Sequence, residues 1–322
     1  MNPARPGQPR TAEHGVPVRA AAEPVFRLLA DLDAWPRVFP PFVHLERLGQ
    51  DERGRERVGM WAMSGERIDH WVALRTVDEA GLRVSFVPES APPPLGSMHR
   101  SWVVEPEGAE ACTVRLLHEY TVREDADAGA LAAVERTVAE IAAAELSAVQ
   151  AAAELVAAFP KLLLEVEDSV TIAAPARAVY AFLLDAGRWP ERLDHVASAD
   201  VREDGPDTHV LELVTNEQRG GTFTTKTARV GIAPHKIAYK QLLLPPLGSS
   251  HHVQWLIEET AHGTTVTSRQ TVVIKESGVA AVLGEGTDLA QARAFVRREL
   301  SSKVLLVLEQ ARDHLESVER TS

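Results

Sequence analysis

The stretch EPVFRLLADLDAWPRVFP, at residues 23–40, recurs in altered form as RAVYAFLLDAGRWPERLD at residues 177–194. With Trp189 set on Trp35, an offset of 189 − 35 = 154 residues, the identities are Val25/Val179, Leu29/Leu183, Asp31/Asp185, Trp35/Trp189 and Pro36/Pro190. Each stretch has the apolar spacing of a short helix. We expect the helix to stop before Trp-Pro, because a residue that precedes proline is disfavoured in the α region.

The repetition extends well beyond this helix. PPLGS at residues 93–97 recurs at residues 245–249, and further on His99 and Trp102 meet His251 and Trp255. The offset drifts by only a few residues, which indicates a tandem duplication of a unit of roughly 155 residues, too long for a solenoid repeat. We therefore expect a mobile tail at residues 1–10, a first domain at 11–159 and a second domain at 160–322.

The composition argues against several classes of function. The net charge of −12 is unsuited to nucleic acid and to an anionic membrane surface. The single cysteine, Cys112, allows no disulfide within the chain and no cysteine-rich metal site, and it fits a reducing, cytoplasmic setting. The alanine-rich segment at residues 128–158 is interrupted by charged residues, which favours a soluble helix over a membrane span.

Both halves show the same order of predicted elements: a strand, a short helix, about six further strands and a long helix. We predict strands at residues 13–20, 42–49, 57–63, 67–77, 82–87, 97–106 and 112–122, and again at 165–173, 196–204, 208–215, 221–230, 237–243, 251–259 and 264–274. The long helices are predicted at about 130–158 and 287–319, with Leu131, Val134, Val138, Ile141 and Leu146 largely on one face of the first. This order predicts an α+β fold in which a curved antiparallel sheet wraps a long helix and leaves an internal cavity.

The order of elements resembles the helix-grip fold of the START and Bet v 1-like (birch-pollen-allergen) superfamily, in which Trp-Pro follows the first helix. The tandem arrangement at this length is similar to the two-domain polyketide aromatase/cyclases of bacterial type II aromatic polyketide pathways. That resemblance implies a cytoplasmic enzyme, without metal or other cofactor, that closes and dehydrates the first ring of a ketoreduced poly-β-ketone. It also implies that the chain is held on an acyl carrier protein and that other polyketide synthase components are partners.

One family motif supplies the first candidate residues. In single-domain relatives a strand reads roughly Trp-Ser-Trp-Val-Ser-Glu-Arg, and its arginine is catalytic. The matching stretch here is WAMSGER, at residues 61–67. Trp61 and Arg67 match, whereas Met63 and Gly65 replace the second tryptophan and the serine, and Phe42 stands where the family has a tyrosine. Local substitutes for the missing hydroxyl groups are Ser64, Asp69, His70, His99 and His118.

The resemblance implies that a buried Arg67 holds the enolate or carbonyl oxygen, as an always-charged donor can. Asp69, His99 or His118 would move protons, and Arg219, His251 and Trp255 would be the counterparts in the second copy. The expected substrate contacts are Trp35, Phe42, Trp61, Met63, Ser64, Trp71, Trp102, Trp189 and Trp255. If Arg67 faces inward, Asp69 and Trp71 share its face. His99 and Trp102 cannot both face inward on an ideal strand, and the sequence leaves open which one does.

Other interpretations remain at this stage. Trp35 and Trp189 are also explained as packing residues that fix the short helices, and the fold also suits a non-catalytic lipid-binding protein or a scaffold for a synthase assembly. Docking of an acidic carrier protein requires a local basic patch. The candidates are Arg53, Arg55, Arg57 and Arg100 in the first copy and Arg297, Arg298 and Lys303 in the second.

Overall fold

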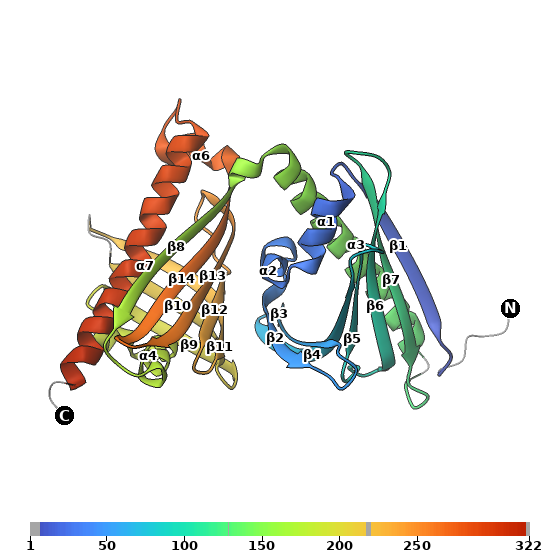
Figure 1. Ribbon diagram of the computed structural model, residues 1–322, viewed down its shortest axis with the longest axis horizontal. Helices are drawn as coiled ribbons and strands as arrows, with labels where there is room; N and C mark the ends of the chain where they lie inside the picture. Colours follow the sequence, from blue (N-terminus) through green and yellow to red (C-terminus); the bar gives the residue numbers. More distant parts are fainter. Residues whose placement is uncertain (1–6, 128, 217–219, 320–322) are drawn as a thin grey trace. The chain divides into compact units, whose positions relative to one another are not determined.

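The chain folds into two compact units. A computed structural model describes residues 7–127, 129–216 and 220–319, and most of the expected tail at residues 1–10 lies outside this part, although the first strand already begins at Arg10. The boundary between the units lies between Pro160 and Lys161, apart from the hairpin tip Ala62–Asp69, which groups with the second unit. Within the described residues, each unit contains one seven-stranded sheet and one long helix (Figure 1). The α+β class expected from the sequence is confirmed.

The first unit has its strands in the spatial order β1-β7-β6-β5-β4-β3-β2. Its elements are β1 (Arg10–Val18), α1 (Ala22–Ala30), the 3₁₀ turn η1 (Leu32–Ala34), α2 (Trp35–Val38), β2 (Phe42–Gln50), β3 (Glu56–Ser64), β4 (Arg67–Asp78), β5 (Arg83–Pro88), β6 (Leu95–Pro106), β7 (Cys112–Val122) and α3 (Ala130–Ala158).

The second unit repeats this arrangement, with the strand order β8-β14-β13-β12-β11-β10-β9. Its elements are η2 (Pro160–Leu162), β8 (Leu163–Ile172), α4 (Ala176–Leu184), η3 (Ala186–Arg188), α5 (Trp189–Arg192), β9 (Val196–Gly205), β10 (Thr208–Asn216), β11 (Thr222–Ile232), β12 (Lys236–Gln241), β13 (Gly248–Thr260), β14 (Gly263–Ile274), η4 (Glu276–Gly278), α6 (Val279–Leu283) and α7 (Leu289–Glu319).

Helix α3 packs on the first sheet through a narrow apolar stripe. Its buried residues are Val134, Val138, Ala142, Leu146, Val149 and Ala153, and the helix lies against β1 and β7. The prediction for Ile141 was wrong, because this side chain is exposed and the smaller Ala142 faces the sheet instead. By length and composition α3 could cross a membrane, but contact of its stripe with its own sheet is typical of the core helix of a globular domain.

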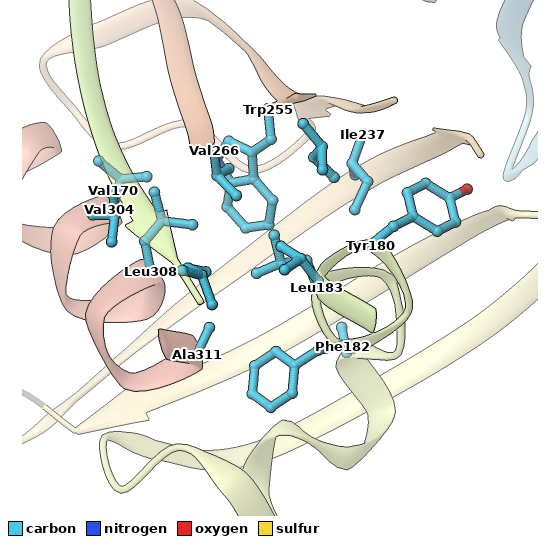
Figure 2. Packing of buried hydrophobic residues seen from close by; sticks show 14 of the residues in the cluster. Val170, Tyr180, Phe182, Leu183, Ile237, Trp255, Val266, Val304, Leu308 and Ala311 are labelled. Atoms are coloured by element: carbon cyan, nitrogen blue, oxygen red, sulfur yellow. The ribbon is translucent and has the colours of Figure 1, made fainter. Parts of the chain in front are cut away.

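Helix α7 has the same role in the second unit. Figure 2 shows Val304, Leu308 and Ala311 of α7 beside Val170 and Trp255 of the sheet, and all five belong to one buried cluster. The helix thereby covers β8 and β14, as α3 covers β1 and β7. The face of each sheet that is turned toward its long helix is called the inner face below.

Trp35 packs at the corner where the first short helix meets the sheet. It is 2% exposed, and its indole N–H donates to the carbonyl of Leu29 at 2.9 Å. The rings of Phe39, Phe42 and Phe86 lie 4.7, 5.1 and 5.0 Å from it. In the second unit the indole of Trp189 donates to the carbonyl of Phe182 at 3.2 Å. The packing interpretation of these two tryptophans therefore has a direct structural basis.

A buried arginine fixes the same corner from the sheet. Arg75 on β4 donates to the carbonyl of Ala30, the last residue of α1, and to the carboxylate of Glu56 at 2.5 Å. Arg229 on β11 donates to the carbonyl of Leu183, near the end of α4, at 2.9 Å. A positive charge is favourable at the carbonyl end of a helix, so each arginine ties the short helix to its sheet.

The Trp-Pro dipeptide differs from the expectation in one respect. Trp35 is helical, with φ −57° and ψ −44°, and begins the one-turn helix α2 instead of following the end of α1. Pro36 lies in the first turn of α2, where its missing N–H would have no helical partner in any case. A 3₁₀ turn fills the interval between the two helices.

Truncation of the corner tryptophan tests this account of the fold. Trp35→Ala should lower the free energy of unfolding of the first unit by about 3–5 kcal/mol, because it removes a fully buried ring and leaves a cavity. Trp35→Phe keeps most of the packing and should cost much less. The exposed Leu48→Ala serves as control and should change stability by no more than about 0.5 kcal/mol in urea unfolding. A loss for Trp35→Ala as small as that of the control would contradict the corner role.

Candidate active site

The strand register decides which candidates face the interior of the first unit. Met98, Arg100 and Trp102 on β6 pair with Tyr120, His118 and Leu116 on β7. Tyr120 packs against Val134 and Val138 of α3, so these two rows lie on the inner face. His99 lies on the opposite face, where it approaches Glu119 at 3.8 Å. Of the two alternatives that the sequence left open, Trp102 is therefore the inward residue and His99 the outward one, and a catalytic role of His99 stays a prediction.

Arg100 and His118 form a polar group on the inner face. Arg100 makes an ion pair with Glu145 of α3, and the two side chains are 22% and 14% exposed. The Nδ1 atom of His118 is buried and has no hydrogen bond in the described part of the chain. Burial, with the positive charge of Arg100 and the nearby His14, lowers the pKa of His118 to about 3. His118 is therefore a neutral imidazole at neutral pH.

The residues around this pair offer further hydrogen-bonding groups. His14 on β1 lies edge-on to His118 with ring centroids 6.5 Å apart. Buried atoms of His14 (Nδ1), Arg100 (Nε) and Trp102 (Nε1) have no partner in the described residues. Since buried polar groups are normally hydrogen-bonded, this set is arranged as a ligand site requires. The ring of Phe39, 5.6 Å from Trp102, supplies an apolar wall.

Strand β4 carries Arg67 on the same side as Arg75, but not at the same depth. By alternation Arg67, Asp69, Trp71 and Arg75 share one face. Arg67 and Asp69 are exposed, Trp71 is half-buried, and Arg75 is buried. The expectation of a buried Arg67 was therefore wrong, because the strand starts at an exposed hairpin. The arginine held deep inside this row is Arg75.

The remaining first-copy candidates divide between the two faces. Trp61 stacks on His70, 4.3 Å away, and His70 alternates with the inward Trp71, so Trp61 faces outward and does not line the interior. Met63 is half-buried two residues further along, and Ser64 is exposed at the hairpin. Phe42 lies inside, 6.0 Å from Trp71.

In the second unit, His251 lies on the inner face. The register pairs His251, Val253 and Trp255 with Val272, Gln270 and Ser268. The ring nitrogens of His251 lie 2.7 Å from Gln241 Oε1 and 3.1 Å from Gln270 Oε1. Burial is the main cause that lowers the pKa of His251 to about 4.

The two copies are not equivalent at the histidine positions. Counted back from Trp102 and Trp255, which both face inward, the counterpart of His251 is Met98 and not His99. Relative to the first copy, the second copy has one extra residue before the histidines. The pairing of β6 with β7 and that of β13 with β14 are both irregular near the start of β6 and of β13. Arg219, the proposed counterpart of Arg67, lies outside the described residues.

Sequence reasoning missed several residues that the structure places inside. Arg75 and Arg229 are separated by the same 154 residues as Trp35 and Trp189, and this constant offset was the signal that could have found them. Arg100 was considered only for docking, whereas its ion pair with Glu145 holds it on the inner face. Nothing local in the helical sequence distinguishes Glu145 from the exposed glutamates of α3.

The structure also contains open hollows on the first unit. One, of about 740 Å³, lies along α1 and includes Glu23, Arg27 and Arg47; another, of about 670 Å³, lies between Pro93 and the start of α3. Neither is lined by the predicted site residues, so the internal cavity stays a prediction. Among the described residues no group of three or more histidine, cysteine, aspartate or glutamate side chains is arranged to hold a metal ion.

The chain is similar to curated proteins of polyketide pathways. It is 36% identical over 301 residues to the granaticin polyketide synthase bifunctional cyclase/dehydratase of Streptomyces violaceoruber, covering 93% of this chain and 92% of that protein. It is 33% identical over 319 residues to the actinorhodin polyketide synthase bifunctional cyclase/dehydratase of Streptomyces coelicolor, covering 95% and 97%.

Solved structures agree over the same length. The di-domain ARO/CYC BexL from the BE-7585A biosynthetic pathway matches with a TM-score of 0.88 and 41% identity, covering 95% of this chain and 99% of that one. The di-domain ARO/CYC StfQ from the steffimycin pathway matches with a TM-score of 0.85 and 30% identity, covering 96% and 99%. The family described as polyketide cyclase/dehydrase and lipid transport matches twice, at residues 9–154 and 164–305. The chain therefore belongs to this family, as a two-domain polyketide cyclase/dehydratase.

Proposed function

We propose that this enzyme folds, cyclises and dehydrates the first ring of a ketoreduced poly-β-ketone held on an acyl carrier protein. The observation that carries this proposal is the set of unpartnered polar groups around Arg100 and His118 on the inner face of the first unit. Buried donors beside aromatic walls are what a folded polyketone needs, because its carbonyl oxygens require hydrogen bonds while its carbon chain requires apolar contact. A purely lipid-binding interior would need no such groups.

The steps of the reaction define what the side chains of the site must do. One methylene loses a proton, the resulting enolate carbon bonds to a distant carbonyl carbon, and the new alkoxide takes up a proton. Loss of an adjacent proton and of this hydroxyl group as water then introduces one ring double bond. Enolisation of the remaining ring ketones, with loss of a second water where the ring contains the ketoreduced carbon, completes the aromatic ring. Arg100 is suited to hold the developing negative oxygen. His118, as a neutral imidazole, can donate a hydrogen bond to a carbonyl without introducing a second charge.

Arg67 and Asp69 take a different part in this scheme. They lie at the exposed end of the β4 row that leads inward past Trp71 to Arg75. Their position suits contact with the polyketone where it enters from the carrier arm. The aromatic side chains Phe42, Trp71 and Trp102 would then bend the chain so that its reacting carbons meet.

We further propose that the enzyme acts in the cytoplasm and that the carrier protein docks on Arg297 and Arg298 of α7. Both side chains are exposed. The basic candidates of the first copy offer less free positive charge for docking. Arg55 is paired with Asp51 at 2.8 Å, and Arg57 with Glu89 at 2.6 Å. An acidic protein of net charge −12 needs a local positive surface to attract an acidic carrier.

Product analysis with a minimal polyketide synthase and a ketoreductase tests the function. The wild type should shift the products toward a correctly closed first aromatic ring. Arg100→Gln should reduce that product by about 100-fold, through loss of the charged donor, and Arg67→Ala by about tenfold. Arg115→Gln is the matched control, because this arginine lies on the outer face of β7 in ion pairs with Glu13 and Glu105.

An unchanged product mixture with the wild type would contradict the proposed function for that substrate. An equal loss with Arg115→Gln would contradict the role of the inner face.

The neutral state of His118 has a consequence for stability. The folded chain resists protonation down to about pH 3, whereas the unfolded chain takes up the proton near the ordinary pKa of 6.5. The neutral state of His118 therefore contributes fully to the free energy of unfolding above pH 6.5, and this contribution is lost as the pH falls toward 3. His118→Gln should reduce the slope of unfolding free energy against pH by up to about 1.4 kcal/mol per pH unit in this window. Urea unfolding at a series of pH values measures the slope, and an unchanged slope would refute the buried neutral imidazole.

Charge reversal tests the docking surface. The double substitution Arg297→Glu, Arg298→Glu should slow processing of a carrier-bound substrate by about tenfold and leave a free substrate mimic unaffected, because rim charges mainly govern association. Arg53→Glu is the control on the other patch. Equal effects on bound and free substrates would exclude docking at these arginines.

A further inference from the structure

The buried arginine of the corner has a different cross-strand neighbour in each unit. Arg75 in the first unit contacts the carboxylate of Glu56 on β3. In the second unit the register sets His209 of β10 opposite Arg229. Strands β3 and β10 occupy the same place in the two sheets. His209 therefore stands where the first unit has the carboxylate that neutralises the arginine.

Arg229 is surrounded by aromatic rings and is only 2% exposed. Its guanidinium lies 5.0 Å from the ring of Trp189 and 5.4 Å from the rings of both Tyr239 and Trp255. One amino group donates to Leu183, but the Nε–H has no partner in the described part of the chain. Burial lowers the pKa of Arg229 to about 10, which still leaves it charged at neutral pH.

His209 does not compensate this charge. It is 3% exposed, and its Nε2 also lacks a partner among the described residues. Burial and the charge of Arg229 lower the pKa of His209 to about 3, so the imidazole is neutral at neutral pH. A buried cation without a counter-charge is costly even with aromatic contacts, and an anionic ligand would relieve that cost.

More donors continue along the inner face from Arg229. Trp255 pairs with Ser268 across β13 and β14, and both side chains are buried. Neither Trp255 Nε1 nor Ser268 Oγ has a hydrogen bond in the described residues. Arg229, Trp255 and Ser268 thus form a row of unsatisfied donors beside flat apolar rings, which suits a planar ligand with oxygen at its edge.

We propose that the inner face of the second unit binds the ionised oxygen of a phenol or enol through Arg229, with Trp255 and Ser268 donating to the same ligand. This inference rests on the proposed function, because ring closure and dehydration turn β-diketones into phenols and enols. Among the described residues of the first unit, the corresponding arginine, Arg75, is already neutralised by Glu56 and is not available to an anionic ligand in the same way. The first unit has Glu56 at this position and uses its arginine for structure alone. The second unit has His209 there, which leaves Arg229 able to bind a ligand.

The test uses the full chain and 4-nitrophenol, whose ionised form absorbs at longer wavelength than the neutral form. At a pH where the free probe is mostly neutral, wild-type protein should increase the absorbance of the ionised form. His209→Glu supplies the missing carboxylate without removing the bond from Arg229 to α4, so it should fold as the wild type does. It should weaken binding of the ionised probe by about tenfold, as loss of a charged hydrogen bond does.

Matched controls isolate the charge. His209→Gln keeps this position neutral and should retain the absorbance change. Arg269→Met removes an exposed arginine paired with Glu167 on the same sheet and should also retain it. 4-Nitroanisole, which cannot ionise, should bind the wild type and His209→Glu equally well.

The proposal is overturned if the wild type gives no absorbance change, or if His209→Glu gives the same change as the wild type. A change lost equally in Arg269→Met would also overturn it, as binding to general surface charge. The product assay reports separately on the proposed function. A wild type that shifts the products but does not ionise the probe contradicts this inference alone, whereas one that ionises the probe and leaves the products unchanged contradicts only the proposed function.

Discussion

Each unit depends on a buried guanidinium that donates to the last turn of the first short helix. The carbonyl end of a helix carries unsatisfied acceptors and a partial negative charge. In this fold that end is pressed against a sheet, where water is excluded. Arg75 satisfies the carbonyl of Ala30, Arg229 satisfies that of Leu183, and the indoles of Trp35 and Trp189 take a neighbouring carbonyl. The repeated Trp-Pro sequence is therefore half of a corner whose other half lies some forty residues further along each copy.

This constraint explains why the offset between the copies is 154 both at the short helix and at the buried arginine, although it differs elsewhere along the chain. An insertion between Trp35 and Arg75 would move the guanidinium away from the carbonyl of Ala30, unless the strand paired with β4 gained a residue as well. Loops after β4 bear no such restraint. Desolvation of the arginine must still be offset, and the units do this differently: Glu56 provides an opposite charge, whereas the second unit relies on aromatic rings and a helix end.

Much of the fold could be predicted from the sequence, because alternation and helical periodicity directly encode which residues are buried. The extent of α3 was predicted correctly, although Ile141 was not, since helix rotation is set by close packing and small residues such as alanine give little signal. The depth of Arg67 could not be predicted, because periodicity gives a side chain its face but not its distance from the strand end. The equivalence of His99 and His251 was wrong for a related reason: a single inserted residue reverses the face that a strand residue occupies.

The inner faces of the two units differ in charge, so the two copies suit ligands of different charge. In the first unit Arg75 and Arg100 are each paired with a glutamate, and the adjacent His118 is neutral, so this interior is close to electrically balanced. In the proposed reaction a neutral polyketone enters this interior without losing strong hydration, and Arg100 responds as negative charge develops. In the second unit no carboxylate of the described residues balances the buried charge of Arg229, which favours the proposed anionic ligand. The fold requires the arginine in both copies but does not require Glu56. At that one position the second copy could change its ligand chemistry while keeping the corner on which its fold depends.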